Sequence, residues 1–382
     1  MNFRRSKGED IIEKGSNFYW YFWHLGNEGA KSILDSIFLL ALKCLIPVYY
    51  FGFLLKRFSK TKNAVKKFPV ISVGNLTMGG TGKTPCVELL VRKLSDKKLR
   101  VGLLTGGYAR KSKDNKKITS SPARENIKIK DVGDEPYLFS KHFPSVPIFV
   151  SRDRVKSLSE AAQKQECDVF VMDDAFQYHY IKKDLEILLI NKRNPFGNGH
   201  LLPAGFLREP IGSVKKADLI IFTHCDENTE NNNSFSISIL SKQSAGIPVL
   251  ESVHEPLYFE DFVTGEKYQA GEIANKRLLS LCSLADPLSF EKSLKKLNLE
   301  PVKKVRFPDH YIYKSKDIGW LNDFIKKENI DFIATTEKDW VRLPKEARIS
   351  TPVLCLIMDF KITKSGEILD KMIDKVLGKY IK

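Results

Sequence analysis

The sequence predicts an α/β protein: a parallel sheet with helices on both faces, followed by a second, smaller α/β domain. Short apolar runs alternate with helical patterns between about Phe68 and Thr223, which is typical of parallel strands joined by helices. A glycine-rich loop lies between the first of these runs and an amphipathic pattern. The length of 382 residues also favours two domains over one.

Charge and cysteine content limit the class of protein. The formal net charge is +16, so an anionic partner is expected: nucleic acid, a phosphorylated substrate or an acidic membrane. The apolar fraction of 42% describes a globular chain rather than a disordered one. The six cysteines lie far apart, without a C-x-x-C pair or a Cys/His cluster at zinc spacing. They are therefore expected to be reduced core residues.

Residues 1–67 are expected to form a helical segment that associates with a membrane. An aromatic cluster, Phe18–Trp23, precedes the almost wholly apolar run Ile37–Leu55, and basic residues lie on both sides. A spanning helix needs about 20 apolar residues, and Lys43 and Pro47 interrupt this run. A helix lying in the membrane interface is therefore favoured over a true span and over a buried helical hairpin. A secretory signal is not expected, because no small-residue cleavage site follows.

The segment FPVISVGNLTMGGTGKTPCVELLVRKL, residues 68–94, predicts a strand, a loop and a helix. The apolar run Phe68–Val73 leads into the loop, and apolar residues recur at helical spacing after Thr84. Backbone N–H groups at such a helix N-terminus bind phosphate. The expected nucleotide-binding residues are Thr77, Met78, Gly79, Gly80, Thr81, Gly82, Lys83 and Thr84.

Within this loop Lys83 is expected to place a positive charge at the β- and γ-phosphates, and Thr84 a hydroxyl on Mg²⁺. The G-x-x-x-x-G-K-[ST] pattern has glycine where this chain has Thr77, so Gly79 and Gly80 are expected to supply the backbone freedom. The alternative is an ordinary glycine-rich turn, and the flanking strand and helix argue against it. The fold expected is thus a sheet like that of P-loop NTPases.

Polar side chains follow several of the apolar runs, where ligands of an α/β sheet gather. Asp173 and Asp174 follow one run and are expected, with Thr84, to reach the Mg²⁺ shell, although aspartate also caps helices. Asp134 either caps a helix or accepts the proton of a substrate hydroxyl. Arg154 either begins a solvated helix or clamps phosphate.

The segment 191–209 is long for a connection and rich in glycine and proline, so it is either a substrate loop or a disordered insert. Its apolar residues beside Arg208 and Glu209 suit an acylated, phosphorylated substrate. The polar run Asp226–Ser234 is expected to mark a domain boundary. The expected divisions are the segment 1–67, a kinase-like domain 68–226, a linker 227–250 and a C-terminal α/β domain 251–382.

In the second half, strand-like runs are expected at Phe235–Leu240, Val249–Val253 and Phe332–Ala334. His310 lies in the turn-like segment FPDHY. A lone histidine is more often structural than catalytic. If it faced Asp134, it could share the proton of that carboxyl group.

Taken in order, GNLTMGGTGKTP, GDEPYL, DDAFQ, FGNGHLLPAGFLRE, FPDHY and TTEKDW resemble the tetraacyldisaccharide 4′-kinase of lipid A biosynthesis. The resemblance covers most of the chain, and the ordered set is far more specific than a phosphate loop alone. It implies ATP- and Mg²⁺-dependent phosphorylation of the 4′-hydroxyl of tetraacyldisaccharide 1-phosphate, which gives lipid IVA. It also implies a peripheral or monotopic enzyme at the cytoplasmic face of a bacterial inner membrane.

Residue by residue, the resemblance implies that Asp134 is the catalytic base, His310 its partner and Lys83 a catalytic phosphate ligand. It implies that Asp173 and Asp174 are the acidic pair, and it assigns further substrate-site positions to Tyr108, Arg154, Gln177, Arg208 and Glu209.

Two positions depart from the family pattern. The family's Ser-Arg-Gly-Tyr is Thr105-Gly106-Gly107-Tyr108 here, which lacks an arginine for which Arg110 is a candidate replacement. The family's Phe-Gln-His is Phe176-Gln177-Tyr178, with His179 one place later.

Two other classes are the alternatives. A membrane-associated P-loop GTPase or ATPase switch would hydrolyse nucleotide without lipid, and the guanine motif N/T-K-x-D has only a near match at residues 336–339. A nucleic-acid-binding ATPase would need basic residues interleaved with aromatics, which occur only beside the apolar run, where lipid explains them better. A monomer with no nucleic-acid partner is expected.

Overall fold

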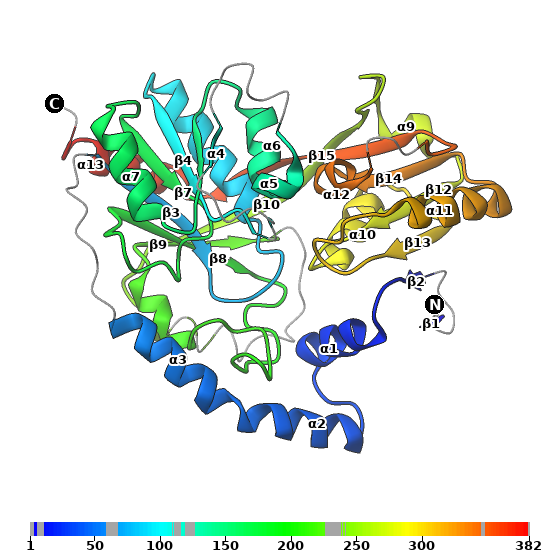
Figure 1. Cartoon of the computed structure of the whole chain (residues 1–382), viewed down its shortest axis with the longest axis horizontal. Helices are drawn as coiled ribbons and strands as arrows, with labels where there is room; N and C mark the ends of the chain where they lie inside the picture. Colours follow the sequence, from blue (N-terminus) through cyan, green and yellow to red (C-terminus); the bar gives the residue numbers. More distant parts are fainter. Residues whose placement is uncertain are drawn as a thin grey trace. The chain divides into compact units, whose positions relative to one another are not determined.

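The computed structural model describes residues 4–5, 11–58, 68–108, 110, 116–118, 127–225, 238, 240, 242–344 and 348–380. The chain forms two compact units (Figure 1): unit 1 is Met1–Phe22 with His254–Asp359, and unit 2 is Trp23–Val253 with Phe360–Lys382. This division differs from the one expected from sequence, because the N-terminal residues and the last helix each pack with distant parts of the chain. The boundary segment, residues 226–234, lies outside the described residues.

Unit 2 is built on a mainly parallel sheet with the strand order β10-β9-β8-β3-β7-β4-β6-β5. Its pairs are parallel, except that the edge strand β5 runs antiparallel to β6. The strands are β3 (Val70–Asn75), β4 (Val101–Thr105), β5 (Lys116–Ile118), β6 (Ile148–Val150), β7 (Val169–Met172), β8 (Leu185–Asn191), β9 (Leu219–Thr223) and β10 (Val249–Asp261). The predicted parallel sheet is therefore confirmed, and its central strands are buried apolar runs.

Helices cover both faces of this sheet. On one face Phe170 and Met172 of β7 pack with Leu158 of α7 (Arg154–Gln163). Because strand side chains alternate, Val169 and Val171 face the other side, where α4 (Lys83–Asp96) packs on β3, β7 and β4. The remaining elements of the unit are α5 (Ile129–Val132), α6 (Asp134–His142), the 3₁₀ helix η2 (Ile211–Lys216) and α13 (Gly366–Leu377).

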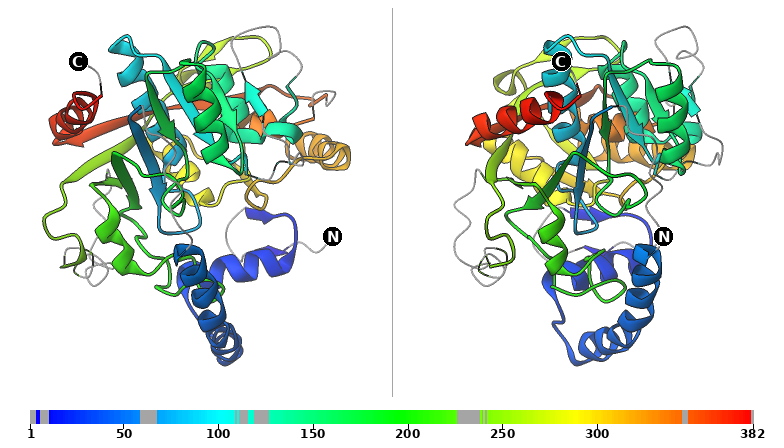
Figure 2. Two further views of the ribbon diagram at one scale, coloured as in Figure 1. Left: turned by 60° about the vertical axis from the view of Figure 1, so that its left-hand side comes forward. Right: turned by 90° about the vertical axis from the view of Figure 1, so that its left-hand side faces the viewer.

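The N-terminal segment forms α1 (Asn17–Glu28), α2 (Ile33–Cys44) and α3 (Ile46–Phe58). The helices α2 and α3, in blue, lie along the outside of unit 2 in each view of Figures 1 and 2. The segment Ile33–Leu55 is long and apolar enough to cross a membrane by length and composition. Only 6% of its most apolar stretch is buried. The exposed apolar side chains are Ile33, Leu34, Ile37, Leu40, Leu45, Val48, Phe51 and Leu55. A buried hairpin, one of the alternatives, is therefore not what this segment forms.

Unit 1 is a second, smaller α/β assembly with the parallel strand order β2-β13-β12-β14-β15. Its strands are β1 (Arg4–Arg5), β2 (Ile11–Glu13), β11 (Lys267–Tyr268), β12 (Leu278–Cys282), β13 (Lys303–Arg306), β14 (Phe332–Thr336) and β15 (Val353–Lys364). Its helices are α9 (Ala270–Ile273), α10 (Pro287–Lys296), α11 (Ser315–Glu328) and α12 (Glu337–Arg342). The long strands β10 and β15 contribute residues to both units.

Two expectations for the second half have different outcomes. The strand at Val249–Val253 is confirmed as the start of β10. The strand expected at Phe235–Leu240 is wrong for the two residues of that run that the structure describes, since Ser238 and Leu240 are helical. Leu240 packs into the apolar cluster of β8 and β9, which accounts for its own apolar character.

Candidate functional site

The glycine-rich loop runs from the end of β3 to the first turn of α4. Gly82 has φ 76° and directly precedes α4, and Gly79 has φ 117°; both values favour glycine. The loop is held from outside, because the N–H of Met78 donates to the carbonyl of Phe206 at 2.7 Å. The backbone N–H groups at the start of α4, such as those of Lys83 and Thr84, and the helix dipole make this position an anion site.

Lys83 is oriented by two oxygen atoms. Its Nζ donates to Asn75 Oδ1 at 3.3 Å and lies 3.6 Å from Asp174 Oδ1. The amide nitrogen of Asn75 donates to Thr81 Oγ1 at 2.9 Å, so Asn75 connects the two ends of the loop. Sequence reasoning missed Asn75; the signal was an amide at the end of an otherwise apolar strand.

A group of oxygen atoms surrounds Thr84. Thr84 Oγ1 donates to Glu135 Oε1 at 3.1 Å, and Asp173 Oδ2 accepts a hydrogen bond from Thr105 Oγ1 at 3.3 Å. Asp173 Oδ1 is buried and accepts no hydrogen bond from the described residues. Burial, with the carboxylates of Glu135 and Asp174, raises the pKa of Asp173 to about 7.

The oxygen atoms of Thr84, Glu135 and Asp173 fit a hard divalent cation, because such cations prefer oxygen ligands. A cation would neutralise Asp173, whose buried carboxylate lies near the carboxylates of Glu135 and Asp174. No three His, Cys, Asp or Glu side chains of the described chain form a metal cluster by themselves, and nucleotide phosphates supply part of the shell in P-loop enzymes. Glu135 is a further residue that sequence reasoning missed, although it lies inside the GDEP segment.

Asp174 lies against basic side chains, and its place in the Mg²⁺ shell stays a prediction. It has a left-handed φ of 45°, and both of its carboxylate oxygens lie 3.0 Å from Arg208 Nη1. Burial alone would raise the pKa of Asp174, but Lys83, Arg208 and Arg154 together lower it below the usual range. Arg208 Nη1 also donates to Gln177 Oε1 at 3.2 Å. The predicted residues Lys83, Asp174, Gln177 and Arg208 therefore form one cluster.

The neighbouring Glu209 has different partners. It is fully buried and accepts a hydrogen bond from Lys216 Nζ at 2.5 Å, while His179 Nε2 lies 3.8 Å away. Tyr49 of α3 donates its hydroxyl proton to the carbonyl of Arg208 at 2.8 Å. The exposed helix pair is thus tied directly to the segment that carries Arg208 and Glu209.

The two departures from the expected pattern meet at Arg154. A Cβ atom at Gly106 would lie 3.0 Å from Arg154 Nη2, with no other described side chain within 4 Å. The Arg154 guanidinium is 5.2 Å from the Tyr178 ring centre, and its backbone N–H donates to the Tyr178 hydroxyl at 3.0 Å. Its Nη1 donates to the carbonyl of Asp174 at 3.2 Å. Arg110, the candidate replacement, donates instead to the carbonyl of Val150 at 3.4 Å.

Asp134 is the first residue of α6 and is 4% exposed. Its Oδ1 accepts a hydrogen bond from the backbone N–H of Glu135 at 3.0 Å. This contact is compatible with the alternative that Asp134 serves the start of the helix. A Cβ atom at Gly133, where φ is 94°, would lie 2.8 Å from the carbonyl oxygen of Tyr108, so only glycine lets these segments approach. Tyr108 itself is 63% exposed.

His310 belongs to unit 1, where it follows β13 in a turn and has φ 57°. Its Nδ1 is 3.1 Å from Arg342 Nη2, and its Nε2 is 3.7 Å from Asp309 Oδ2. Asp134 belongs to unit 2, so the pairing of His310 with Asp134 stays a prediction.

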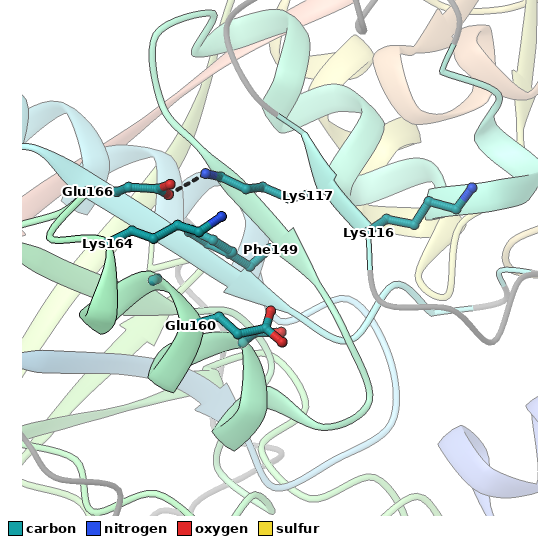
Figure 3. A pocket seen from close by; sticks show the side chains of 8 residues that line it. Lys116, Lys117, Phe149, Glu160, Lys164 and Glu166 are labelled. Atoms are coloured by element: carbon teal, nitrogen blue, oxygen red, sulfur yellow. Dashed lines mark hydrogen bonds and ion pairs between the residues drawn. The ribbon is translucent and has the colours of Figure 1, made fainter.

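A pocket between β5, β6 and α7 shares no residue with this cluster (Figure 3). Its labelled side chains are Lys116, Lys117, Phe149, Glu160, Lys164 and Glu166. Lys117 forms an ion pair with Glu166, and three lysines and two glutamates line the pocket. The pocket is not where the predicted functional residues gather.

Comparison with known proteins gives consistent matches. The model of the family described as tetraacyldisaccharide-1-P 4′-kinase matches residues 38–378. A tetraacyldisaccharide 4′-kinase of Desulfatibacillum aliphaticivorans is 33% identical over 90% of each chain, and one of Syntrophus aciditrophicus is 32% identical over 77% of this chain and 80% of the other. The crystal structure of LpxK from Aquifex aeolicus in complex with ATP has a TM-score of 0.67 and 30% identity, and it covers 90% of this chain and 100% of the other.

Proposed function

The chain belongs to the tetraacyldisaccharide-1-P 4′-kinase family, and from this premise we propose how its own residues carry out the reaction. It is a tetraacyldisaccharide 4′-kinase, an ATP-dependent enzyme of lipid A biosynthesis. The observation that carries the proposal is the cluster at the N-terminus of α4, where Lys83 is held by Asn75 and Asp174. A switch protein needs no acylated acceptor, and the family match disfavours that alternative.

The loop 77–84 binds the phosphates of ATP through backbone N–H groups, and Lys83 adds a cation at the β- and γ-phosphates. Thr84 and Asp173, with Glu135 beside them, hold Mg²⁺; the support is the buried Asp173 Oδ1 that accepts no hydrogen bond from the described chain. When bound, Mg²⁺ neutralises charge on the phosphate oxygens. Asp174 keeps Arg208 and Lys83 in place.

Asp134 accepts the proton of the 4′-hydroxyl, and His310 is its partner. The carboxylate is buried at the start of α6, next to Glu135, which contacts Thr84. This contact supports a base close to the phosphate loop. Most of the rate enhancement then comes from positioning and from charge stabilisation at the transferred phosphoryl group.

The proposal also assigns substrate and membrane contacts. The phosphorylated disaccharide contacts Arg154, Gln177 and Arg208. Glu209 and the exposed Tyr108 belong to the same proposed substrate site. The apolar side chains of α2 and α3 enter the acyl region of the cytoplasmic face of the inner membrane, and the net charge of +16 favours anionic lipid. We expect a monomer that is peripheral or monotopic.

The direct test is transfer of labelled γ-phosphate from ATP to tetraacyldisaccharide 1-phosphate in detergent micelles. A labelled lipid that is absent with Lys83→Ala supports the proposal, because that variant keeps the fold and loses the phosphate cation. ATP turnover without labelled lipid would contradict it and favour a different acceptor or the switch.

Arg154→Ala is expected to lower kcat/KM by about 100-fold, because a cation near the acidic pair is lost. Adding Gly106→Arg in that background is expected to recover about tenfold, because the space beside position 106 is then free for a new guanidinium. Arg152→Ala removes an exposed arginine two residues away and serves as the control. Full activity of Arg154→Ala would refute this role.

Leu40→Glu with Phe51→Glu is expected to weaken partition onto anionic vesicles by about tenfold or more, because two exposed apolar side chains no longer enter the lipid. Turnover in detergent micelles should change much less. Ser36→Glu places one glutamate at an exposed polar position of α2 and is the control for each single substitution. Point substitutions are cleaner than deletion of α1, since Trp20 and Trp23 are buried. Unchanged partition would exclude this surface as the membrane contact.

A further inference from the structure

A buried hydrogen-bond network in unit 1 surrounds Asp339, the aspartate of the TTEKDW segment. Asp339 is fully buried in the first turn of α12. Its Oδ1 accepts from the backbone N–H of Ser283 at 2.9 Å and from the Tyr313 hydroxyl at 3.1 Å. Its Oδ2 accepts from Thr336 Oγ1 at 2.7 Å. With donors on both oxygens, this carboxylate has a fixed position.

Asp339 in turn fixes Arg342, three residues later on the same helix. Arg342 Nη1 lies 3.7 Å from Asp339 Oδ1 and donates to the carbonyl oxygen and to the hydroxyl oxygen of Ser283, both at 2.9 Å. The Arg342 side chain is almost completely buried. Its Nη2 lies 3.1 Å from His310 Nδ1. A planar guanidinium held at one nitrogen therefore presents its other nitrogen to the histidine.

This contact decides which ring nitrogen of His310 carries the proton. A guanidinium group has N–H donors and no acceptor, so His310 Nδ1 has to accept. A neutral imidazole whose Nδ1 accepts carries its proton on Nε2. His310 Nε2 lies 3.7 Å from Asp309 Oδ2, and a carboxylate on that side also favours a proton on Nε2.

The backbone of this turn is held as well. The N–H of Asp309 donates to the Tyr19 hydroxyl at 3.0 Å, and the N–H of Tyr311 donates to the carbonyl of Pro308 at 3.1 Å. His310 between them has a left-handed φ of 57°, a conformation that non-glycine residues adopt when their surroundings enforce it. Backbone and ring are thus fixed independently.

We propose that Arg342 is a positioning residue that keeps His310 in its Nε2–H form, so that His310 acts as a hydrogen-bond donor and not as a proton acceptor at Nδ1. The role of this His310 donor in the reaction rests on the proposed function. In the proposed pairing with Asp134, the Nε2–H is the donor, and Asp134 alone takes the proton of the 4′-hydroxyl. The side chain of Asp339, 3.7 Å from Arg342 Nη1, keeps Arg342 in place.

The test is long-range proton–nitrogen NMR of full-length protein labelled with ¹⁵N-histidine, with His310→Gln assigning the signal among the seven histidines. In the wild-type protein at neutral pH, Nδ1 should show the shift of a nitrogen without a proton and Nε2 that of an N–H. Arg342→Lys keeps a cation beside Asp339 but lacks the planar pair of donors. In this variant the two ring nitrogens should shift towards each other, as the two neutral forms exchange.

Lipid phosphorylation by Arg342→Lys should be about tenfold slower with an unchanged KM for ATP, because one oriented hydrogen bond is lost. Arg348→Lys makes the same change at an exposed position and should leave both readouts as in the wild type. A proton on Nδ1 in the wild-type protein, or an unchanged spectrum in Arg342→Lys, would overturn the proposal. Because the spectrum does not depend on turnover, failure of the kinase assay would contradict the proposed function separately.

Discussion

Asp134→Asn is expected to lower the rate of lipid phosphorylation by about 10²- to 10⁴-fold, the usual contribution of a general base. Asparagine has nearly the shape of aspartate, and its oxygen can still accept the backbone N–H of Glu135 that Asp134 Oδ1 accepts now. It cannot take the proton of the 4′-hydroxyl. The start of α6 should therefore remain folded while the chemical step fails.

Affinity for ATP should be nearly unchanged in Asp134→Asn, since the phosphates are bound by the loop and Lys83. The measurements are single-turnover transfer and equilibrium binding of nucleotide. Asp131→Asn makes the same chemical change in the preceding helix α5 and should behave as the wild type. If Asp134→Asn turned over at near the wild-type rate, Asp134 would be only a helix-terminal residue, which is the alternative that its contact with Glu135 keeps open.

Much of the phosphate site follows from sequence, because its signal is local. The loop at Gly79–Thr84 joins a strand and a helix that are adjacent in the chain, and Asp173 and Asp174 end a strand that pairs directly with β3. Strand ends at one edge of a parallel sheet necessarily come together. Strand order thus brings Lys83 and Asp174 together, whereas Arg208 reaches them from the long segment after β8.

The rest depends on contacts between segments distant in sequence. Nothing local shows that Glu135 reaches Thr84, 51 positions away, or that Arg154 lies beside Gly106. Arg110 was the candidate replacement for the arginine missing at position 106, whereas the guanidinium beside Gly106 is that of Arg154. Similarly, β2 joins the sheet of unit 1 through Ile11–Glu13, a run too short to predict.

Asp173→Asn is expected to make the nucleotide-free protein more stable and the enzyme less active. Asp173 is buried near Glu135 and Asp174, which together with burial raise its pKa to about 7, against about 3.9 in an unfolded chain. Below both values the carboxyl group is protonated in either state and adds no penalty. As the pH rises from about 4 to 7, the unfolded chain releases this proton while the folded chain retains it, so stability falls.

An asparagine at this position does not titrate, so the melting temperature of Asp173→Asn should exceed that of the wild type by a few degrees at pH 8, and the difference should shrink towards pH 4. Both measurements are made without nucleotide and Mg²⁺. Adding ATP with Mg²⁺ should stabilise the wild type much more than the variant, because the variant lacks the anionic oxygen for the cation. Transfer should fall by about 10²-fold or more. A variant that is less stable than the wild type at pH 8 without ligands would mean that Asp173 serves the fold rather than the metal.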